Sequence, residues 1–239
     1  MSSMTEPIKK KKVAILQSNY IPWRGYFDLI HDVDEFIFYD DVQYTKNDWR
    51  NRNRIKTPYG TKWITIPVGA HNDKLICEIE FRDHTWTVQH WDIFRQYYSK
   101  AAYFKQYEDF FKNIYFGIQW KSLSELNQYM IKQISTELLG ITTLFKDSRS
   151  FKVNGVKQER LIQLLTKTEA NIYISGPAAK AYIDDADFQQ AGIQLIYKEY
   201  PDYPDYNQFH PPFDPFVSII DLIFHTGPEA PYYIWGWRS

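Results

Sequence analysis

The sequence predicts an α/β protein built on a Rossmann-like, mostly parallel sheet, with a β-hairpin and an aromatic-rich helical insertion. Three observations support this class. The apolar run Val13–Leu16 is followed by a turn, a helical pattern and a second strand pattern at 35–40. Strands and helices alternate again after residue 140. Aromatic residues make up 18% of the chain and are frequent between 85 and 116, a stretch with helical spacing and few breakers.

The length of 239 residues fits one compact domain. We therefore expect a single α/β domain over 13–239, with the helical insertion around 85–140. Residues 1–12 contain four consecutive lysines and no apolar stretch long enough for a signal peptide, so they are expected to form a disordered basic tail.

After the opening β-loop-α-β unit, residues 51–68 have the pattern of two strands around a Pro-Tyr-Gly turn, which predicts a hairpin. A short strand is expected at 75–81. Ser122 and Glu125 form a capping-box pattern that begins a helix running to Leu139, and Gly140 is suited to end it.

The remaining chain predicts strands at 142–148, 171–176 and 193–200, and helices at 156–170, 178–184 and 217–227. The segment 201–215 is rich in Pro, Asp and Tyr and is expected to be an ordered loop. A repeated strand-then-helix order is typical of a parallel sheet.

Charge and cysteine usage limit the class of partner. The formal net charge is −1, so no overall field favours nucleic acid. A lone cysteine, Cys77, forms no internal disulfide, and no apolar run approaches the roughly 20 residues needed to span a bilayer. We expect a cytoplasmic protein with a small-molecule ligand, without membrane insertion.

The loop after the first strand is the first candidate site, because ligands of open parallel sheets bind at the carboxyl ends of strands. Its residues supply amides, flat rings, a fixed cation and a glycine that permits close backbone approach: Gln17, Asn19, Tyr20, Trp23, Arg24, Gly25 and Tyr26. A rigid turn whose tryptophan fills the core is an equally good interpretation.

The hairpin carries the second candidate site. In a strand, Arg50, Arg52, Arg54 and Lys56 share one face and could hold a phosphate or carboxylate. Lys46, Arg52, Asn53 and Lys56 are the candidates. The alternative is a solvated outer face, which shows the same period of two.

Two later segments add proton-transfer candidates. His90 has an ordinary pKa near neutrality, and Lys180 lies in a Ser-Gly-Pro turn segment with Ser175 and Tyr182. A histidine beside a tryptophan is more often a packed residue. The spacing of His84 and His90 lacks further ligands, so no metal site is expected. Nucleophile-elbow, Walker and dinucleotide-binding motifs do not occur.

An ordered series of motifs resembles the WbqC-like protein family, which is associated with O-antigen and other surface-polysaccharide loci. The motifs are QSNYIPWRGYF, QYTKNDWRNRNRIK, KWITIPV, the pair His90 and Trp91, YISGPAAKAYID with the later AGI, and FVSIIDLIFHTG. The resemblance places these residues at recurring motif positions: Gln17, Tyr20, Pro22, Trp23, Gly25, Tyr26, Lys46, Arg52, Asn53, Lys56, Ser175, Lys180, Tyr182, Ser218 and Asp221.

The resemblance implies a bacterial, cytoplasmic protein of lipopolysaccharide biosynthesis that acts on an amino sugar or sugar nucleotide. One hypothesis is a transferase that attaches a small acyl or aminoacyl group, with His90 and Lys180 moving protons. A second is a non-catalytic module that binds a sugar nucleotide or an acyl carrier and serves other pathway enzymes. A third is a nucleotidylyltransferase-like ligase that uses ATP, although the H-x-G-H pair of that fold is replaced here by a loop with Arg24 alone. The cofactor stays unknown.

Overall fold

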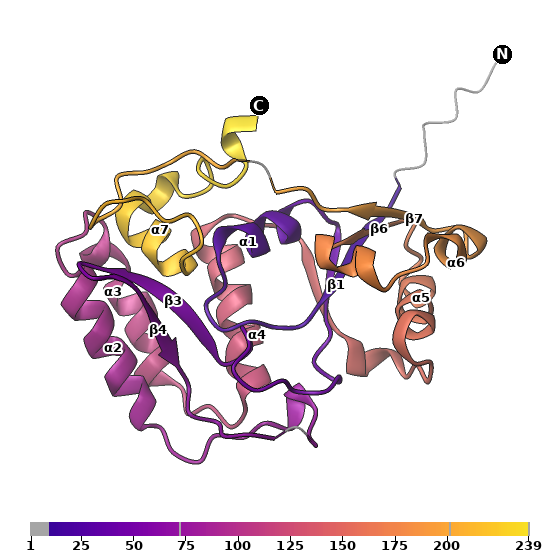
Figure 1. Ribbon diagram of the computed structural model, residues 1–239, viewed down its shortest axis with the longest axis horizontal. Coiled ribbons are helices and arrows are strands. Elements are labelled where there is room, and N and C mark those ends of the chain that lie inside the picture. Colours follow the sequence, from indigo (N-terminus) through magenta and orange to yellow (C-terminus); the bar gives the residue numbers. More distant parts are fainter. Residues whose placement is uncertain (1–9, 72, 201, 239) are drawn as a thin grey trace.

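The computed structural model describes residues 10–71, 73–200 and 202–238. Its centre is a five-stranded, entirely parallel sheet with the strand order β5-β2-β1-β6-β7 (Figure 1). A separate antiparallel hairpin pairs β3 with β4. The strands are β1 Lys12–Leu16, β2 Glu35–Phe38, β3 Arg52–Thr57, β4 Gly60–Thr65, β5 Leu144–Asp147, β6 Ile172–Ser175 and β7 Gln194–Tyr197. This confirms the predicted class.

Helices connect and cover these strands. They are α1 Arg24–His31, α2 Thr85–Tyr98, α3 Phe104–Lys112, α4 Leu123–Gln133, α5 Lys157–Lys167, α6 Asp185–Gln190 and α7 Ile219–Thr226. Short π-helical turns follow α3 and α4, and a 3-10 helix at Pro177–Ala181, here called η5, follows β6. Ser122 Oγ accepts the Glu125 N–H at the start of α4, and Gly140 lies at φ +66° beyond its end, as the capping pattern predicted.

The two faces of the sheet bury different cores. Val13 and Ile15 of β1 point into a smaller apolar cluster with Leu164 and Leu165 of α5 and with Phe188 of α6. Ala14, on the other face, belongs to a much larger cluster. Successive strand residues alternate between faces, so the apolar pattern of β1 needs cover on both sides, as a doubly wound sheet provides.

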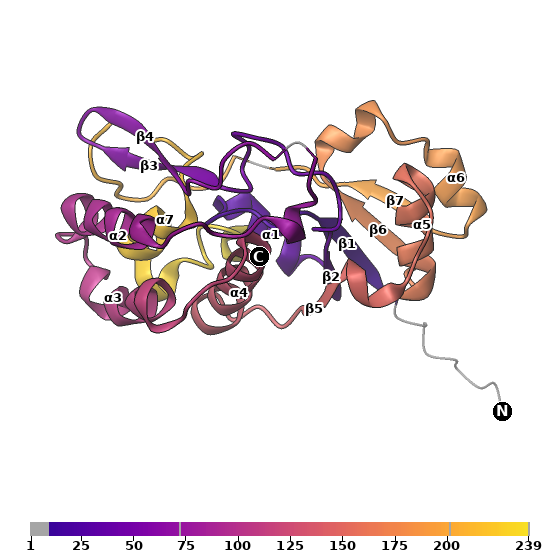
Figure 2. The ribbon, with the colours of Figure 1, turned by 90° about the horizontal axis from the view of Figure 1, so that it is seen from below.

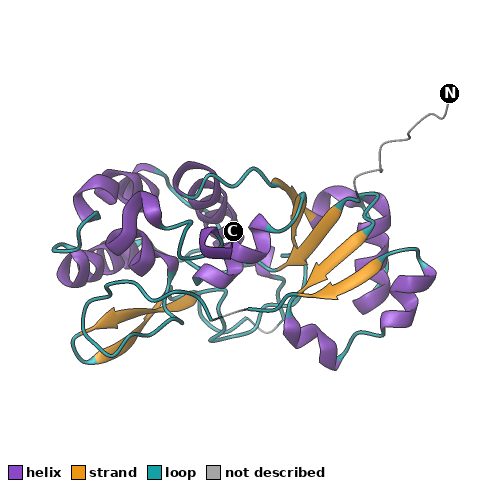
Figure 3. Cartoon of the chain, turned by 90° about the horizontal axis from the view of Figure 1, so that it is seen from above, coloured by secondary structure: helices purple, strands orange, loops and turns teal. Residues whose placement is uncertain are grey.

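The larger cluster extends from the sheet into a helical lobe formed by α2, α3, α4 and α7, against which the hairpin packs (Figures 2 and 3). Fully buried rings from distant segments meet there, including Tyr20, Trp86, Phe94 and Phe224. Most of the aromatic content of this chain therefore serves packing, which is the commonest use of such rings.

Two local expectations differ from the structure. Residues 75–81 contain a 3-10 turn, Ile76–Glu78, with only an isolated bridge between Gln43 and Leu75, so the short apolar stretch packs as a loop and not as a strand. The last lysines of the expected tail belong to the fold: Lys12 begins β1, and the Lys11 ammonium lies 2.8 Å from Glu35 Oε2. The first nine residues lie outside the described part.

Within the described residues, no helix is both long enough and apolar enough to cross a bilayer.

Candidate functional site

Strand order reverses between β1 and β6. From β1 the chain proceeds to β2 and β5 on one side, then returns through α5 to β6 and β7 on the other. In an open parallel sheet this reversal separates the loops that follow the two adjacent strands, and it leaves a crevice at their carboxyl ends. Gln17 follows the end of β1. Ser175 is the last residue of the adjacent β6, and Gly176 follows it.

A cavity of about 670 Å³ lies in this crevice, and we call it the switch-point cavity. Its volume falls in the range of about 300–1,000 Å³ that is usual for small-molecule sites. Apolar walls come from residues such as Leu16 and Leu161. The polar and aromatic groups are those of Gln17, Tyr39, Lys157, Gln158, Tyr173, Ser175 and Tyr182.

The hydroxyl groups of this cavity are neutral donors. Ser175 Oγ donates to Tyr173 Oη at 3.3 Å, and burial raises the pKa of Tyr173. Burial also raises the pKa of Tyr39, which directly follows β2. The rings of Tyr39, Tyr173 and Tyr182 offer flat apolar faces and hydrogen-bonding edges, a combination suited to a base or a sugar.

Lys157 supplies the cation of the switch-point cavity and has an unusual backbone. It is the first residue of α5 and adopts φ +50°, a left-handed conformation that non-glycine residues seldom occupy. Such conformations cost about 1–3 kcal/mol and are concentrated at functional sites. The exposed ammonium stands at the amino terminus of α5, where the helix dipole also favours an anion.

Asp40, which lies shortly after β2, holds the loop between β1 and α1 through hydrogen bonds. The buried Asp40 carboxylate accepts the Ser18 N–H at 2.8 Å, the Ser124 hydroxyl at 2.5 Å and the Gln128 amide at 3.0 Å. Ser18 is fully buried between Gln17 and Asn19. These bonds set the positions from which Gln17 and Asn19 reach different cavities.

The hairpin and the loop before it also hold the loop between β1 and α1 through hydrogen bonds. The Asn53 amide nitrogen donates to the carbonyls of Tyr20 and Ile21 at 3.0 and 2.8 Å, and the Tyr20 N–H donates to the Trp49 carbonyl at 2.9 Å. Ile21 adopts φ +37°, an outlier for a β-branched residue, which such bonds can maintain. The turn after β1 and the basic hairpin therefore meet, as the sequence hypothesis requires.

A smaller cavity of about 200 Å³ lies where they meet. We call it the aromatic cleft. The loop after β1 contributes Asn19, Pro22 and Trp23. The loop before β3 contributes Trp49, and β3 contributes Asn53 and Arg54. Phe216, from the segment before α7, completes the lining. Asn19 and Gln17 are two residues apart, so one loop borders both the aromatic cleft and the switch-point cavity.

Several sequence candidates serve as buried structural groups. The Tyr20 hydroxyl lies 2.8 Å from His90 Nδ1 and also contacts the Tyr115 hydroxyl. The Tyr26 hydroxyl donates to the Gln17 carbonyl at 2.9 Å. Lys56, expected on a half-solvated face, is buried and donates to the Pro212 carbonyl. A Cβ at Gly25 would lie 2.3 Å from the Trp23 ring, so this glycine provides room for Trp23 and not for a ligand.

Arg24 is also buried, at 3% exposure. Its Nη1 donates to the Pro204 and Tyr233 carbonyls at 2.9 and 3.2 Å, and its guanidinium lies 4.7 Å from the centre of the Tyr203 ring. Burial lowers the pKa of Arg24. Its Nε and Nη2 have no hydrogen-bond partner within the described residues.

The two proposed proton-transfer residues differ in access. His90 is buried, its Nε2 lies 3.3 Å from the Thr65 carbonyl, and burial lowers its pKa to about 4. Lys180 is exposed on η5, with its ammonium 5.1 Å from the Tyr197 ring centre, on the same short helix as the cavity-lining Ala178 and Ala179. Lys180 is therefore the better placed of the two to meet a ligand.

The remaining basic candidates lie along the hairpin. The Arg52 guanidinium lies 4.2 Å from the centre of the Trp63 ring. Lys46 is exposed in the loop that precedes β3. Arg54 of the hairpin lines the aromatic cleft, and the hairpin cations do not line the switch-point cavity.

Sequence reasoning did not select Tyr39, Lys157, Gln158 and Tyr173. The signal for them was positional. Tyr39 directly follows β2, and Lys157 and Gln158 begin the helix after β5, which are the positions where parallel strands end and helices begin.

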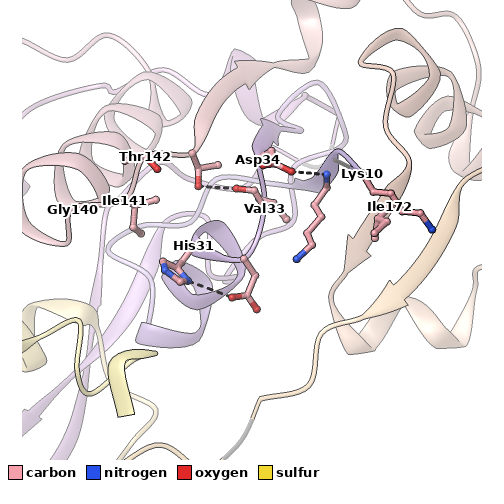
Figure 4. Close-up of a pocket in the computed structure, with 11 residues that line it drawn as sticks. Lys10, His31, Val33, Asp34, Gly140, Ile141, Thr142 and Ile172 are labelled. Carbon is pink, nitrogen blue, oxygen red and sulfur yellow. Dashed lines mark hydrogen bonds and ion pairs between the residues drawn. The ribbon is translucent and has the colours of Figure 1, made fainter. Parts of the chain in front are cut away.

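Another cavity, of about 760 Å³, lies at the opposite edge of the sheet, at the amino ends of β1, β2, β5 and β6. Figure 4 shows Lys10, His31 and Asp34 around it. His31 is stacked on Trp235, with ring centres 4.1 Å apart. Despite its volume, this cavity is at the edge where open parallel sheets do not commonly bind ligands, and we assign it no function.

The fold defines the chain as an open, doubly wound α/β protein with a crevice at the carboxyl ends of its central strands. More specifically, the chain belongs to the WbqC-like protein family, which matches residues 17–233. It is 47% identical over 227 residues to the Mycobacterium tuberculosis (strain ATCC 25618 / H37Rv) protein "Uncharacterized protein Rv1507c", covering 94% of this chain and 97% of that protein. No solved structure matches the chain.

Proposed function

We propose that this protein is a cytoplasmic enzyme of bacterial surface-polysaccharide biosynthesis that binds a nucleotide-linked amino sugar in the switch-point cavity. The observation that carries the proposal is this cavity of about 670 Å³, at the reversal of strand order, lined by three tyrosines, Gln17, Ser175 and Lys157. Family membership supports the pathway, and the position and lining of the cavity support the ligand class.

Each part of such a ligand has a counterpart in the cavity. A base or sugar ring packs against Tyr39 or Tyr173, whose hydroxyls stay protonated. The phosphates lie toward Lys157 and the amino terminus of α5, where a cation and a helix dipole coincide. Gln17 donates to the sugar hydroxyls, and Ser175 Oγ, whose proton goes to Tyr173, accepts from them.

The proposed chemistry is transfer of a small acyl or aminoacyl group to the sugar amine. The amine nitrogen attacks the acyl carbon, the bond to the donor breaks, and the amine loses a proton. Lys180, exposed beside the cavity, accepts that proton when its own amine is neutral. His90 is the alternative base, although its burial and its bond to Tyr20 favour a structural role.

Calorimetry with UDP- and dTDP-linked amino sugars tests ligand binding. Lys157→Ala is expected to weaken binding by about tenfold or more, because a charge-assisted contact contributes about 1.5–3 kcal/mol. Lys167→Ala is the matched control, since Lys167 is exposed at the other end of α5. No binding across a broad panel of these compounds, or equal affinity of the two variants, would contradict the proposal.

A non-catalytic module that binds a sugar nucleotide or an acyl carrier is the second candidate function. The burial of His90 favours it, because one of the two proposed proton-transfer residues is shielded from ligands. Arg52→Ala and Lys180→Ala separate the two functions. Loss of product with retained affinity indicates an enzyme, whereas a proportional loss of both indicates a binding module.

The ligase alternative requires ATP. Mass spectrometry of reactions containing the amino sugar, with either an acyl-CoA donor or ATP and a carboxylic acid, distinguishes these chemistries. Product formed only with ATP, together with released AMP and pyrophosphate or ADP and phosphate, would favour the ligase. Product formed with the acyl-CoA alone would favour the transferase.

A further inference from the structure

The aromatic cleft has features that packing alone does not explain. Three of its surrounding rings remain substantially exposed: Trp49 at 40%, Trp63 at 42% and Phe216 at 55%. They come from β4, from the loop before β3 and from the segment before α7, so the fold brings distant segments together around one hollow. Large apolar side chains gathered on a surface commonly mark a binding site.

The cleft is also cationic. Arg54 lines it and donates through Nη2 to the Phe216 carbonyl at 2.9 Å. The Arg54 guanidinium lies 6.0 and 5.8 Å from the ring centres of Trp49 and Trp63, and Arg52 lies on Trp63. The Nε atoms of both arginines are buried and have no hydrogen-bond partner within the described residues.

Two carboxylates lie near these charges, Asp48 and Asp214, whose Oδ1 accepts the Phe216 N–H at 2.8 Å. Asp48 Oδ2 lies 3.7 Å from Arg50 Nη2, and Arg50 Nη1 donates to the Asn19 side-chain oxygen at the edge of the cleft. Three guanidinium groups against two carboxylates leave a local positive charge. The Asn19 amide nitrogen donates to no group of the described chain and can donate to a ligand.

We infer that the aromatic cleft is a second ligand site, which binds a single sugar ring carrying an anionic group, separately from the switch-point cavity. Its volume of about 200 Å³ is below the range of about 300–1,000 Å³ for drug-sized ligands, so it accommodates a ring and not a whole nucleotide. The apolar face of the sugar packs on Trp49, Trp23 or Phe216, and Arg54 holds the anion. This inference names the sugar part of the proposed function, but its contacts do not depend on the nucleotide site.

The experiment uses the full chain and two small probes, the methyl glycosides of glucuronic acid and of glucose. Binding is followed by saturation-transfer NMR and by tryptophan fluorescence. The anionic glycoside is expected to bind more tightly than the neutral one, and added salt is expected to reduce this difference. Equal binding of the two, or no binding of either, overturns the inference.

Three variants locate the site. Trp49→Ala is expected to weaken binding of the glucuronide by roughly tenfold, as loss of a stacking surface does. Trp49→Phe is expected to retain most of the affinity. Tyr59→Ala is the matched control, because Tyr59 is 94% exposed at the turn of the same hairpin and does not line the cleft. A similar loss in Tyr59→Ala, or none in Trp49→Ala, overturns the assignment.

The outcome is separable from that of the proposed function. Lys157→Ala is expected to leave glucuronide binding unchanged while it weakens binding of UDP, and Trp49→Ala is expected to do the reverse. If UDP does not bind but the glucuronide binds in a Trp49-dependent way, the proposed nucleotide site fails and the cleft inference stands.

Discussion

The switch-point cavity and the buried network beneath α1 both contain charged and polar groups, but they use them differently. In the cavity, Lys157 is exposed and the Ser175 hydroxyl donates to the neighbouring Tyr173 at 3.3 Å. In the network, the fully buried Asp28 lies 2.9 Å from Lys198 Nζ, accepts from Tyr203 at 2.7 Å and also contacts Arg238. Groups paired within the chain stabilise the fold, whereas unpaired groups at a cavity are available to a ligand.

The largest effect is expected at Asp28. Asp28→Ala leaves the buried Lys198 with only the part-exposed Asp32 as a partner and leaves the Tyr203 hydroxyl without its acceptor. Breaking such a buried network costs up to about 3–5 kcal/mol. Denaturant unfolding should show this loss of stability. The matched control is Asp92→Ala, which removes an exposed ion pair with Arg95 and should cost about 0–1 kcal/mol. Equal costs would remove the distinction between the two regions.

The lowered pKa of His90 predicts how the free energy of unfolding depends on pH. Burial lowers its pKa from 6.5 to about 4, so between these values the unfolded chain binds a proton that the folded chain does not. The stability of the fold is thus fully present above about pH 6.5 and falls as the pH drops toward 4, by about 3 kcal/mol. Chemical denaturation at several pH values measures this slope. His90→Gln should make this dependence on pH weaker. His84→Gln is the control, because His84 is partly exposed just before α2, and it should leave the dependence unchanged.

Gly25 tests whether the loop glycine serves packing. Gly25→Ala places a methyl group against the Trp23 ring, which must move, so a cost of about 1–3 kcal/mol is expected. Because Trp23 lines the aromatic cleft, glucuronide affinity should fall as well. Gly176→Ala is the control, since nothing lies within 4 Å of a Cβ there. An unchanged melting temperature in Gly25→Ala would show that the ring has space to shift.

The smallest effect is expected at the cavity rim. Lys180→Ala and Tyr182→Ala remove exposed side chains, and their unfolding free energies should stay within about 0.5 kcal/mol of the parent protein. Thermal unfolding measures this. A loss above about 1 kcal/mol would mean that these residues belong to the structural network and not to the ligand site.

The sequence was sufficient for the architecture. The strand runs at 13–16, 35–38 and 172–175 and the amphipathic helix predicted at 156–170 were recognisable, and their alternation indicates a parallel sheet. The hairpin was recognisable from its turn. The segment at 75–81 was misjudged because a short apolar stretch packs equally well as a loop when its backbone bonds to neighbouring loops, as Ile76 and Cys77 do with Val42 and Asp40.

The site was only partly predictable. Gln17, Ser175 and Tyr182 follow from the rule that strand ends form crevices, and all three line the switch-point cavity. Composition could not separate Lys56 from Arg54 on the same strand, although one is buried on a carbonyl and the other lines a cleft. The positions of these two side chains depend on contacts with Pro212 and Phe216. Both residues are far along the chain, so the sequence around Arg54 and Lys56 does not indicate the contacts.

The three-residue stretch from Gln17 to Asn19 borders two hollows, and Ser18 anchors it to Asp40. A displacement of this short stretch would alter both walls together. If both hollows bind ligands as proposed, this shared stretch would couple their affinities without movement of a whole domain. Selection for a new ligand on one side would likewise be constrained by the shape required on its neighbour.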